Sequence, residues 1–199
     1  VKYVILLNQG SLFFTIFCIY FYFNSLNFSD GLNGISIGSC IYVLSIIIFL
    51  KGSINLFDMS LLIGLVTILI PNLFGRIFLG NSGVSLLSSL VFIYTINFYN
   101  EGIIFFDEII LLFFLPTIDT VRITIERILK GNSPFLSDKN HLHHLMAKII
   151  DKKFVFIPYI IFSILPYLIF KLGLYSYFSF IIFVILYTIV LISLKLKNE

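Results

Sequence analysis

Long apolar stretches alternate with short polar segments along the whole chain. Seven of these stretches approach or reach the roughly 17 to 25 helical residues that cross a hydrocarbon core of about 30 Å. They run approximately over residues 4–23, 35–50, 56–73, 84–98, 104–125, 154–170 and 174–194. The pattern predicts an all-α, polytopic integral membrane protein with about seven transmembrane helices, forming a single transmembrane domain over residues 1–199.

Composition supports this prediction. Apolar residues make up 59% of the chain and charged residues only 12%, which excludes an ordinary soluble domain. Four prolines lie in or near the apolar stretches, namely Pro71, Pro116, Pro158 and Pro166. Because proline cannot donate to the carbonyl four residues before it, we expect kinked helices whose freed carbonyls find partners on neighbouring helices. Cys18 and Cys40 lie inside apolar runs and are interpreted as small buried hydrophobic residues.

Basic residues are distributed unevenly between the loops. Alternating helices place segments 24–34, 74–83 and 126–153 and the C-terminal tail on one side, and this side holds ten of the 13 Lys and Arg residues. The other side holds Lys2, Lys51 and Lys171. Since cytoplasmic loops retain basic residues, we predict an N-terminus outside and a C-terminus in the cytoplasm. The chain starts without methionine in an apolar run, so we expect a fragment that lacks upstream helices.

The largest polar segment, residues 127–146, contains all three histidines. His141 and His144 are three residues apart and project from one face of a short helix, with His143 turned towards the other side. Histidines here can act as phosphate-binding donors, a pH sensor or zinc ligands. Zinc is disfavoured because no cysteine is near. A cationic, histidine-bearing loop between apolar helices suits an anionic ligand at a membrane surface.

A second polar segment, residues 24–34, carries four polar side chains at intervals of three. They are Asn24, Asn27, Asp30 and Asn33. At a helix end such spacing forms a slowly rotating stripe, and Gly31 and Gly34 allow the backbone to approach a ligand closely. An ionisable residue at this depth is costly, which makes Asp30 a functional candidate. Helix capping and interhelical hydrogen bonding remain the alternative.

Two further segments carry weaker signals. In residues 74–85, two glycines enclose Asn81 and Ser82 just before an apolar helix, where backbone N–H groups can face an anion. Phe78 and Arg76 nearby suit a nucleotide, although an ordinary turn explains the same residues.

The second of these segments is the helix end at residues 116–130. It spaces four charges for an ion-pair ladder: Asp119, Arg122, Glu126 and Lys130. The alternative is a satisfied charge stripe entering the cytoplasm, and Asp119 lies deepest.

These segments together resemble the polyprenyl-phosphate N-acetylhexosamine-1-phosphate transferases. Residues 116–146 read PTIDTVRITIERILKGNSPFLSDKNHLHHLM. They are similar to the family's P-x-x-D helix end, its R-x-x-x-G-x-S-P-F-x-x-D run and its H-x-H-H loop. Residues 24–34 resemble N-x-x-N-x-x-D-G-[LI]-[DN]-G, and residues 78–83 resemble F-x-G-D-x-G. The likeness covers essentially the whole chain, which would correspond to the C-terminal seven helices of a ten- or eleven-helix fold.

The resemblance implies transfer of N-acetylhexosamine-1-phosphate from a UDP-sugar to polyprenyl phosphate. This reaction would require Mg²⁺, take place at the bacterial cytoplasmic (inner) membrane and initiate synthesis of a lipid-linked cell-envelope polysaccharide. By the family's motifs the catalytic residues would be Asp30, His141, His143 and His144. Substrate-binding residues would be Asn27, Asn33, Phe78 (stacked on uracil), Asp119, Arg127 and Ser133. Mg²⁺ ligands would be Asn27, Asp30 and Asn81.

The chain also departs from the family pattern. Asn33 stands where many members carry aspartate, and Asn81 replaces the aspartate of F-x-G-D-x-G. Because losing a carboxylate weakens a site for a hard cation, a second hypothesis stays open. In it, the chain is a non-catalytic relative that binds a nucleotide sugar, a lipid phosphate or a partner subunit. Nucleic acid is not an expected partner. The sequence leaves the sugar and the oligomeric state open, a homodimer included.

Overall fold

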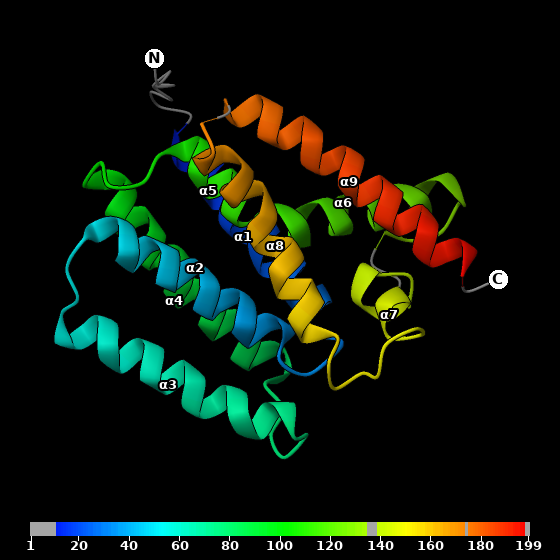
Figure 1. Ribbon diagram of the computed structural model, residues 1–199, viewed down its shortest axis with the longest axis horizontal. Coiled ribbons are helices and arrows are strands. Elements are labelled where there is room, and N and C mark those ends of the chain that lie inside the picture. The colour runs from blue at the N-terminus through cyan, green and yellow to red at the C-terminus, as the bar shows by residue number, and fades with distance from the viewer. Residues whose placement is uncertain (1–10, 135–138, 174, 198–199) are drawn as a thin grey trace.

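The computed structural model describes residues 11–134, 139–173 and 175–197. These residues form nine α-helices and no strand (Figure 1). The helices are α1 (Ser11–Ser29), α2 (Ile35–Lys51), α3 (Leu56–Leu73), α4 (Gly80–Asn100), α5 (Phe106–Leu112), α6 (Phe114–Leu129), α7 (Leu142–Met146), α8 (Phe156–Lys171) and α9 (Ser176–Leu196).

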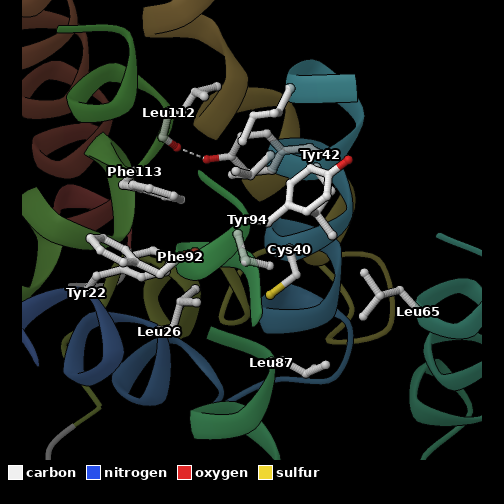
Figure 2. Packing of buried hydrophobic residues seen from close by; sticks show 14 of the residues in the cluster. Tyr22, Leu26, Cys40, Tyr42, Leu65, Leu87, Phe92, Tyr94, Leu112 and Phe113 are labelled. Atoms are coloured by element: carbon white, nitrogen blue, oxygen red, sulfur yellow. Dashed lines mark hydrogen bonds between the residues drawn. The ribbon is translucent and has the colours of Figure 1, made fainter. Parts of the chain in front are cut away.

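The helices pack around two apolar cores. The first core lies mainly between α1, α2 and α4, with Tyr22, Cys40 and Phe92 among its buried side chains (Figure 2). The second core joins α6, α7, α8 and α9 and includes Leu142 and Phe183, neither of which is exposed. The short helix α7 contributes to this second core and packs against α9. Its position is therefore fixed by buried apolar contacts, even though it has only one and a half turns.

The outward faces of the long helices are apolar. Helices α3, α4 and α9 are each long and apolar enough to cross a membrane, and α2 and α8 are shorter apolar helices. On α9, Ile181, Ile185 and Ile189 follow one another at intervals of four, and each is at least half exposed. A helix that stays apolar on the face it turns away from the protein is suited to lipid. The chain is thus an all-helical, polytopic membrane protein, as the sequence pattern predicts.

The predicted fifth stretch, residues 104–125, is divided into α5 and α6 at Phe113. Pro116 cannot donate to the carbonyl of Leu112, which lies four residues earlier. The hydroxyl of Tyr42, on α2, donates to that carbonyl instead (Figure 2). The expectation that a proline-freed carbonyl finds a partner on a neighbouring helix is confirmed here. The other boundaries differ less, although α1 extends to Ser29 and part of the first predicted stretch lies outside the described residues.

We expect Tyr42→Phe to destabilise the bundle by about 1–3 kcal/mol, because it leaves the buried Leu112 carbonyl without its donor. The thermal unfolding midpoint of the protein in detergent measures this effect. Tyr177→Phe is a suitable control, since Tyr177 is 55% exposed. Equal midpoints for the Tyr42 variant and the unchanged protein would show that the hydrogen bond contributes nothing to stability.

The connections gather the polar segments at one end of the bundle. The backbone N–H of Gly34 donates to Asn72 Oδ1 at 2.7 Å, which joins the α1–α2 turn to the end of α3. At the same end, Lys195 of α9 pairs with Glu126 of α6 at 3.1 Å. At the opposite end, Lys51 pairs with Asp58 and Lys171 with Glu108. We call the first of these the site end.

Candidate functional site

The α1–α2 turn at the site end is held by a bridging asparagine. Gly34 has φ 86°, a left-handed conformation that favours glycine, and its N–H points to Asn72 Oδ1. The amide nitrogen of Asn72 donates to the carbonyl of Ile77 at 3.0 Å. Asn72 therefore ties the turn that carries Asp30 to the loop that carries Phe78. Sequence analysis missed Asn72 because it lies inside an apolar helix, beside Pro71.

Gly31 brings two of the sequence motifs into contact. A Cβ atom built on Gly31 would lie 2.7 Å from Nε2 of His143 and 2.7 Å from Nε2 of His144. These distances are shorter than real Cβ contacts, so a side chain at position 31 would require the two imidazoles to shift. The D-G-x-N-G turn and the H-x-H-H loop, more than a hundred residues apart in the chain, are thus in close contact.

Asp119, on α6, anchors the loop that carries His141, His143 and His144, which we call the histidine loop. One of its oxygens lies 2.9 Å from Nδ1 of His141, and both oxygens accept from the backbone N–H of Leu142, at 3.1 and 3.2 Å. It also accepts from Arg122 and Tyr187, at 2.8 and 2.7 Å. The side chain is only 1% exposed. Its bonds are to protein groups, and its predicted role in substrate binding stays a prediction.

His143 is fully buried, yet neither of its ring nitrogens has a hydrogen-bond partner among the described residues. Burial, with smaller contributions from the neighbouring His144 and His141, lowers the pKa of His143 to about 3. The imidazole is therefore neutral at physiological pH and offers one N–H donor and one acceptor. Because an unpaired polar group is costly to bury, this arrangement is typical of a site built to bind a polar ligand.

Arg127 and His141 both lie against Phe28, near the end of α1. The Phe28 ring stacks on the His141 ring with centroids 5.9 Å apart, and the Arg127 guanidinium lies 5.9 Å from the Phe28 centroid. Arg127 is only 5% exposed and donates to the carbonyl of Pro134 at 2.6 Å. Sequence analysis missed Phe28, since an aromatic residue in an apolar helix carries no signal of its own.

Asp30 follows the last residue of α1 and is half-buried. Burial raises the pKa of its carboxyl group, an effect that the Ser36 hydroxyl partly offsets. In the part of the chain that the structure describes, no basic side chain pairs with Asp30. A carboxylate so placed lacks a compensating cation from the protein.

The oxygen donors near Asp30 are suited to a Mg²⁺ ion that has only one or two protein ligands. No group of three or more His, Cys, Asp or Glu residues that could hold a metal ion occurs among the described residues. Mg²⁺ commonly binds through one or two carboxylates, water and substrate phosphates. Asp30 can supply the carboxylate and Asn27, half-buried on the last turn of α1, an amide oxygen. The donor set fits such a shared site rather than a cage made entirely by the protein.

The remaining predicted residues lie in the α1–α2 turn, before or at the start of α4, and after α6. The amide nitrogen of Asn33 lies 3.6 Å from a Cβ built on Gly75, at the start of the loop that leads to α4. Phe78 is 77% exposed and Asn81, on the first turn of α4, is also exposed. No described hydrogen bond or ring contact joins either of them to Asp30 or the histidines. Ser133 is exposed, close to the segment 135–138 that lies outside the described residues.

The predicted ion-pair ladder on α6 is confirmed for its first three members. Arg122 pairs with Asp119 at 2.8 Å and with Glu126 at 2.9 Å. The fourth predicted member, Lys130, has no ion pair among the described residues, and Lys195 of α9 pairs with Glu126 in its place. The ladder therefore links α6 to α9 instead of continuing along α6.

Comparison with known proteins gives this geometry a context. The undecaprenyl-phosphate alpha-N-acetylglucosaminyl 1-phosphate transferase of Escherichia coli K12 is 27% identical over 148 residues, which are 68% of this chain and 40% of that protein. The decaprenyl-phosphate N-acetylglucosaminephosphotransferase of Mycobacterium leprae is 27% identical over 173 residues, 73% of this chain and 44% of that protein. These transferases are homologues of this chain. The resemblance read from the motifs is confirmed at this level.

The match to these homologues is partial. The Yersinia pestis relative of the same name is 25% identical over 146 residues, again 40% of its length. The chain thus spans about two fifths of the length of the curated relatives it matches. No protein-family model and no solved structure matches the chain. What the homologues support is a membrane-bound transferase at the level of the family.

Proposed function

We propose that the complete protein transfers N-acetylhexosamine-1-phosphate from a UDP-sugar to polyprenyl phosphate. The contact at Gly31 is the observation that carries this proposal, because it brings the turn that follows Asp30 against His143 and His144. The names of the homologues supply the substrate class, a polyprenyl phosphate and an N-acetylglucosamine 1-phosphate donor. The activity is proposed for the whole protein, of which this chain matches a part.

The proposed reaction joins two anions. An oxygen of the lipid phosphate attacks the β-phosphorus of the UDP-sugar, a new P–O bond forms, and the diphosphate bond of the donor breaks to release UMP. Mg²⁺, held by Asp30 and the amides of Asn27 and Asn81, would neutralise charge on the phosphoryl oxygens. The neutral His143 imidazole can donate its N–H to one of those oxygens, while Arg127 supplies fixed positive charge.

The location of the site supports a lipid acceptor. It lies at one end of an apolar bundle, where a polyprenyl chain can remain in the bilayer while its phosphate reaches polar groups. We place this end at the cytoplasmic face of a bacterial inner membrane, because the loops and helix ends on this side hold ten of the 13 basic residues. UDP-sugars would then reach the site from the cytoplasm.

Membrane vesicles test both the reaction and the side. Inverted vesicles containing the complete protein, given UDP-N-acetylglucosamine, polyprenyl phosphate and Mg²⁺, should yield a polyprenyl diphosphate sugar identifiable by mass spectrometry. Sealed right-side-out vesicles should yield it only after permeabilisation. Product from sealed right-side-out vesicles would contradict the cytoplasmic placement, and absence of product from both would contradict the reaction.

Asn81 offers a specific test of the metal site. If Asn81 binds Mg²⁺ through a neutral amide, Asn81→Asp adds a carboxylate and should lower the half-saturating Mg²⁺ concentration, on the order of several-fold. A Mg²⁺ titration of transferase activity measures this shift. Asn100→Asp, the same change at the other end of α4, serves as a control.

The titration also addresses the non-catalytic alternative, which the asparagine at position 81 favours. An unchanged half-saturation would remove Asn81 from the metal site and leave it as a residue of the turn before α4. Absence of activity from both versions, with binding of UDP-sugar retained, would favour a non-catalytic relative that holds a nucleotide sugar.

A further inference from the structure

We propose that Tyr187 of α9, together with Asp119 and Arg122 of α6, is a positioning residue that fixes the histidine loop for transfer. This inference rests on the proposed function and extends it to a helix that carries none of the recognised motifs. We call these three residues the α6–α9 clamp. None of them needs to touch substrate for the clamp to act.

Tyr187 connects the two charged members of the clamp. Its hydroxyl donates to Asp119 Oδ1 at 2.7 Å and accepts from Arg122 Nε at 2.7 Å. Arg122 and Asp119 also pair directly at 2.8 Å. Tyr187 is only 2% exposed and belongs to the second apolar core, so its ring is held by packing. The hydroxyl therefore occupies a fixed point between a buried carboxylate and a guanidinium.

The clamp holds three consecutive residues of the histidine loop. Arg122 donates to the carbonyl of Asn140 at 2.7 Å. Asp119 accepts from the backbone N–H of Leu142, and its second oxygen lies 2.9 Å from Nδ1 of His141. Because a carboxylate can only accept, Nδ1 of His141 is the protonated nitrogen, and its Nε2 faces away from Asp119. Both the backbone path and one imidazole orientation are thus set.

The next two residues are the ones that meet the Asp30 turn. His143 and His144 directly follow Leu142, and the Nε2 atoms of both lie against Gly31. A shift of the backbone at residues 140–142 would therefore displace these two imidazoles. Small displacements of groups that act on a reacting phosphate are costly, and loss of an orienting partner typically lowers activity by about 10- to 100-fold.

The surroundings of His141 leave the clamp as its orienting contact. From α6, Asp119 bonds to the ring and Arg122 lies behind that carboxylate. From α1, the face of the ring is covered by Phe28, and from α7 by His143, with centroids 5.5 Å apart. Ring stacking places the imidazole in a plane but does not select which nitrogen carries the proton. The Asp119 carboxylate both orients the ring and sets the proton on Nδ1.

Tyr187→Phe in the complete protein is the test, with Tyr42→Phe as the matched control. Both changes remove one buried hydroxyl, but Tyr42 bonds to Leu112, far from the loop along the chain and outside the clamp. Hydrogen exchange of a peptide covering residues 139–147 reports on the Leu142 amide without requiring activity. We expect the Leu142 amide to exchange at least about tenfold faster in Tyr187→Phe than in the unchanged protein, and at an unchanged rate in the control.

The kinetic expectation is specific to positioning. Tyr187→Phe should lower kcat by about 10- to 100-fold while KM for the UDP-sugar changes by less than about threefold. Asp119→Asn, which keeps the size of the side chain, should give the same pattern and replaces Tyr187→Phe if that variant does not fold. Unchanged exchange at Leu142, or equal losses of kcat in Tyr187→Phe and the control, would overturn the clamp. Absence of transfer by the unchanged protein would instead overturn the proposed function, and the exchange measurement would still decide whether the clamp holds the loop.

Discussion

Asp30→Asn in the complete protein should lower the rate of sugar-phosphate transfer by at least about tenfold, equivalent to about 1.4 kcal/mol of transition-state stabilisation. Asp30 offers a carboxylate at the end of α1 with no basic partner among the described residues. The amide of asparagine has the same shape but no charge, so it weakens any bound cation and any charge stabilisation that depends on it. Initial rates at saturating substrate and Mg²⁺ measure the effect.

Asp30→Asn should not lower the stability of the folded protein. Because partial burial penalises the charged form of Asp30, replacing it with a neutral amide removes that penalty. The unfolding midpoint in detergent should therefore stay the same or rise. Asp107→Asn, at the opposite end of the bundle, is the control and should retain its activity. A variant that kept more than about a tenth of the normal turnover would remove Asp30 from the proposed catalytic residues.

Gly31→Ala should lower transfer by about 100-fold, an effect of position rather than charge. The added methyl group would lie 2.7 Å from Nε2 of both His143 and His144. The backbone of Gly31 lies outside the left-handed region, so alanine causes no conformational strain there. The strain falls on the two imidazoles, and His143 is fully buried and cannot swing into solvent.

Gly64→Ala is the matched control, because a Cβ on Gly64 of α3 would meet nothing within 4 Å. This control should keep full activity and be slightly more stable, since alanine favours a helix by about 1 kcal/mol. Gly31→Ala itself should lose no more than about 1–3 kcal/mol of stability, as expected for local overpacking. If Gly31→Ala retained normal kinetics, the close approach between the turn and the histidine loop would have no role in transfer.

The helices were predictable where an apolar run ends at an unambiguous stop. The prediction for residues 56–73 coincides with α3, whose start is set by the Asn55 and Asp58 capping box. The prediction for residues 35–50 is one residue short of α2, which ends at Lys51 and is followed by Gly52 in a left-handed conformation. Apolar runs between polar turns report on local structure alone, and here local structure decides the boundaries.

The break between α5 and α6 depends on a contact that no local pattern contains. Pro116 indicates that a carbonyl is freed, but the donor comes from Tyr42, seventy residues away. For the same reason, sequence analysis did not identify Tyr187 or Phe28. Each lies in an apolar helix, where a tyrosine or phenylalanine that faces the site cannot be distinguished from one that faces lipid.

The site was predictable as a set of segments but not as a set of contacts. The motifs at residues 24–34 and 116–146 identify the turn and the loop, and the structure joins them at Gly31. Spacing along α6 predicts that Asp119 pairs with Arg122, and this is confirmed. Spacing cannot indicate that the same carboxylate bonds to His141, because that contact requires the loop to fold back onto its own helix.

A doubly labelled donor tests the central claim most directly. UDP-N-acetylglucosamine with one radiolabel in the β-phosphate and a second in the sugar is supplied, with polyprenyl phosphate and Mg²⁺, to membranes containing the complete protein or its Asp30→Asn variant. The proposed reaction breaks the diphosphate bond, so both labels should enter the lipid in equal amounts and UMP should be released, with little transfer by the variant. Sugar label in the lipid without phosphate label, with release of UDP, or no label in the lipid at all, would contradict the proposed phosphosugar transfer.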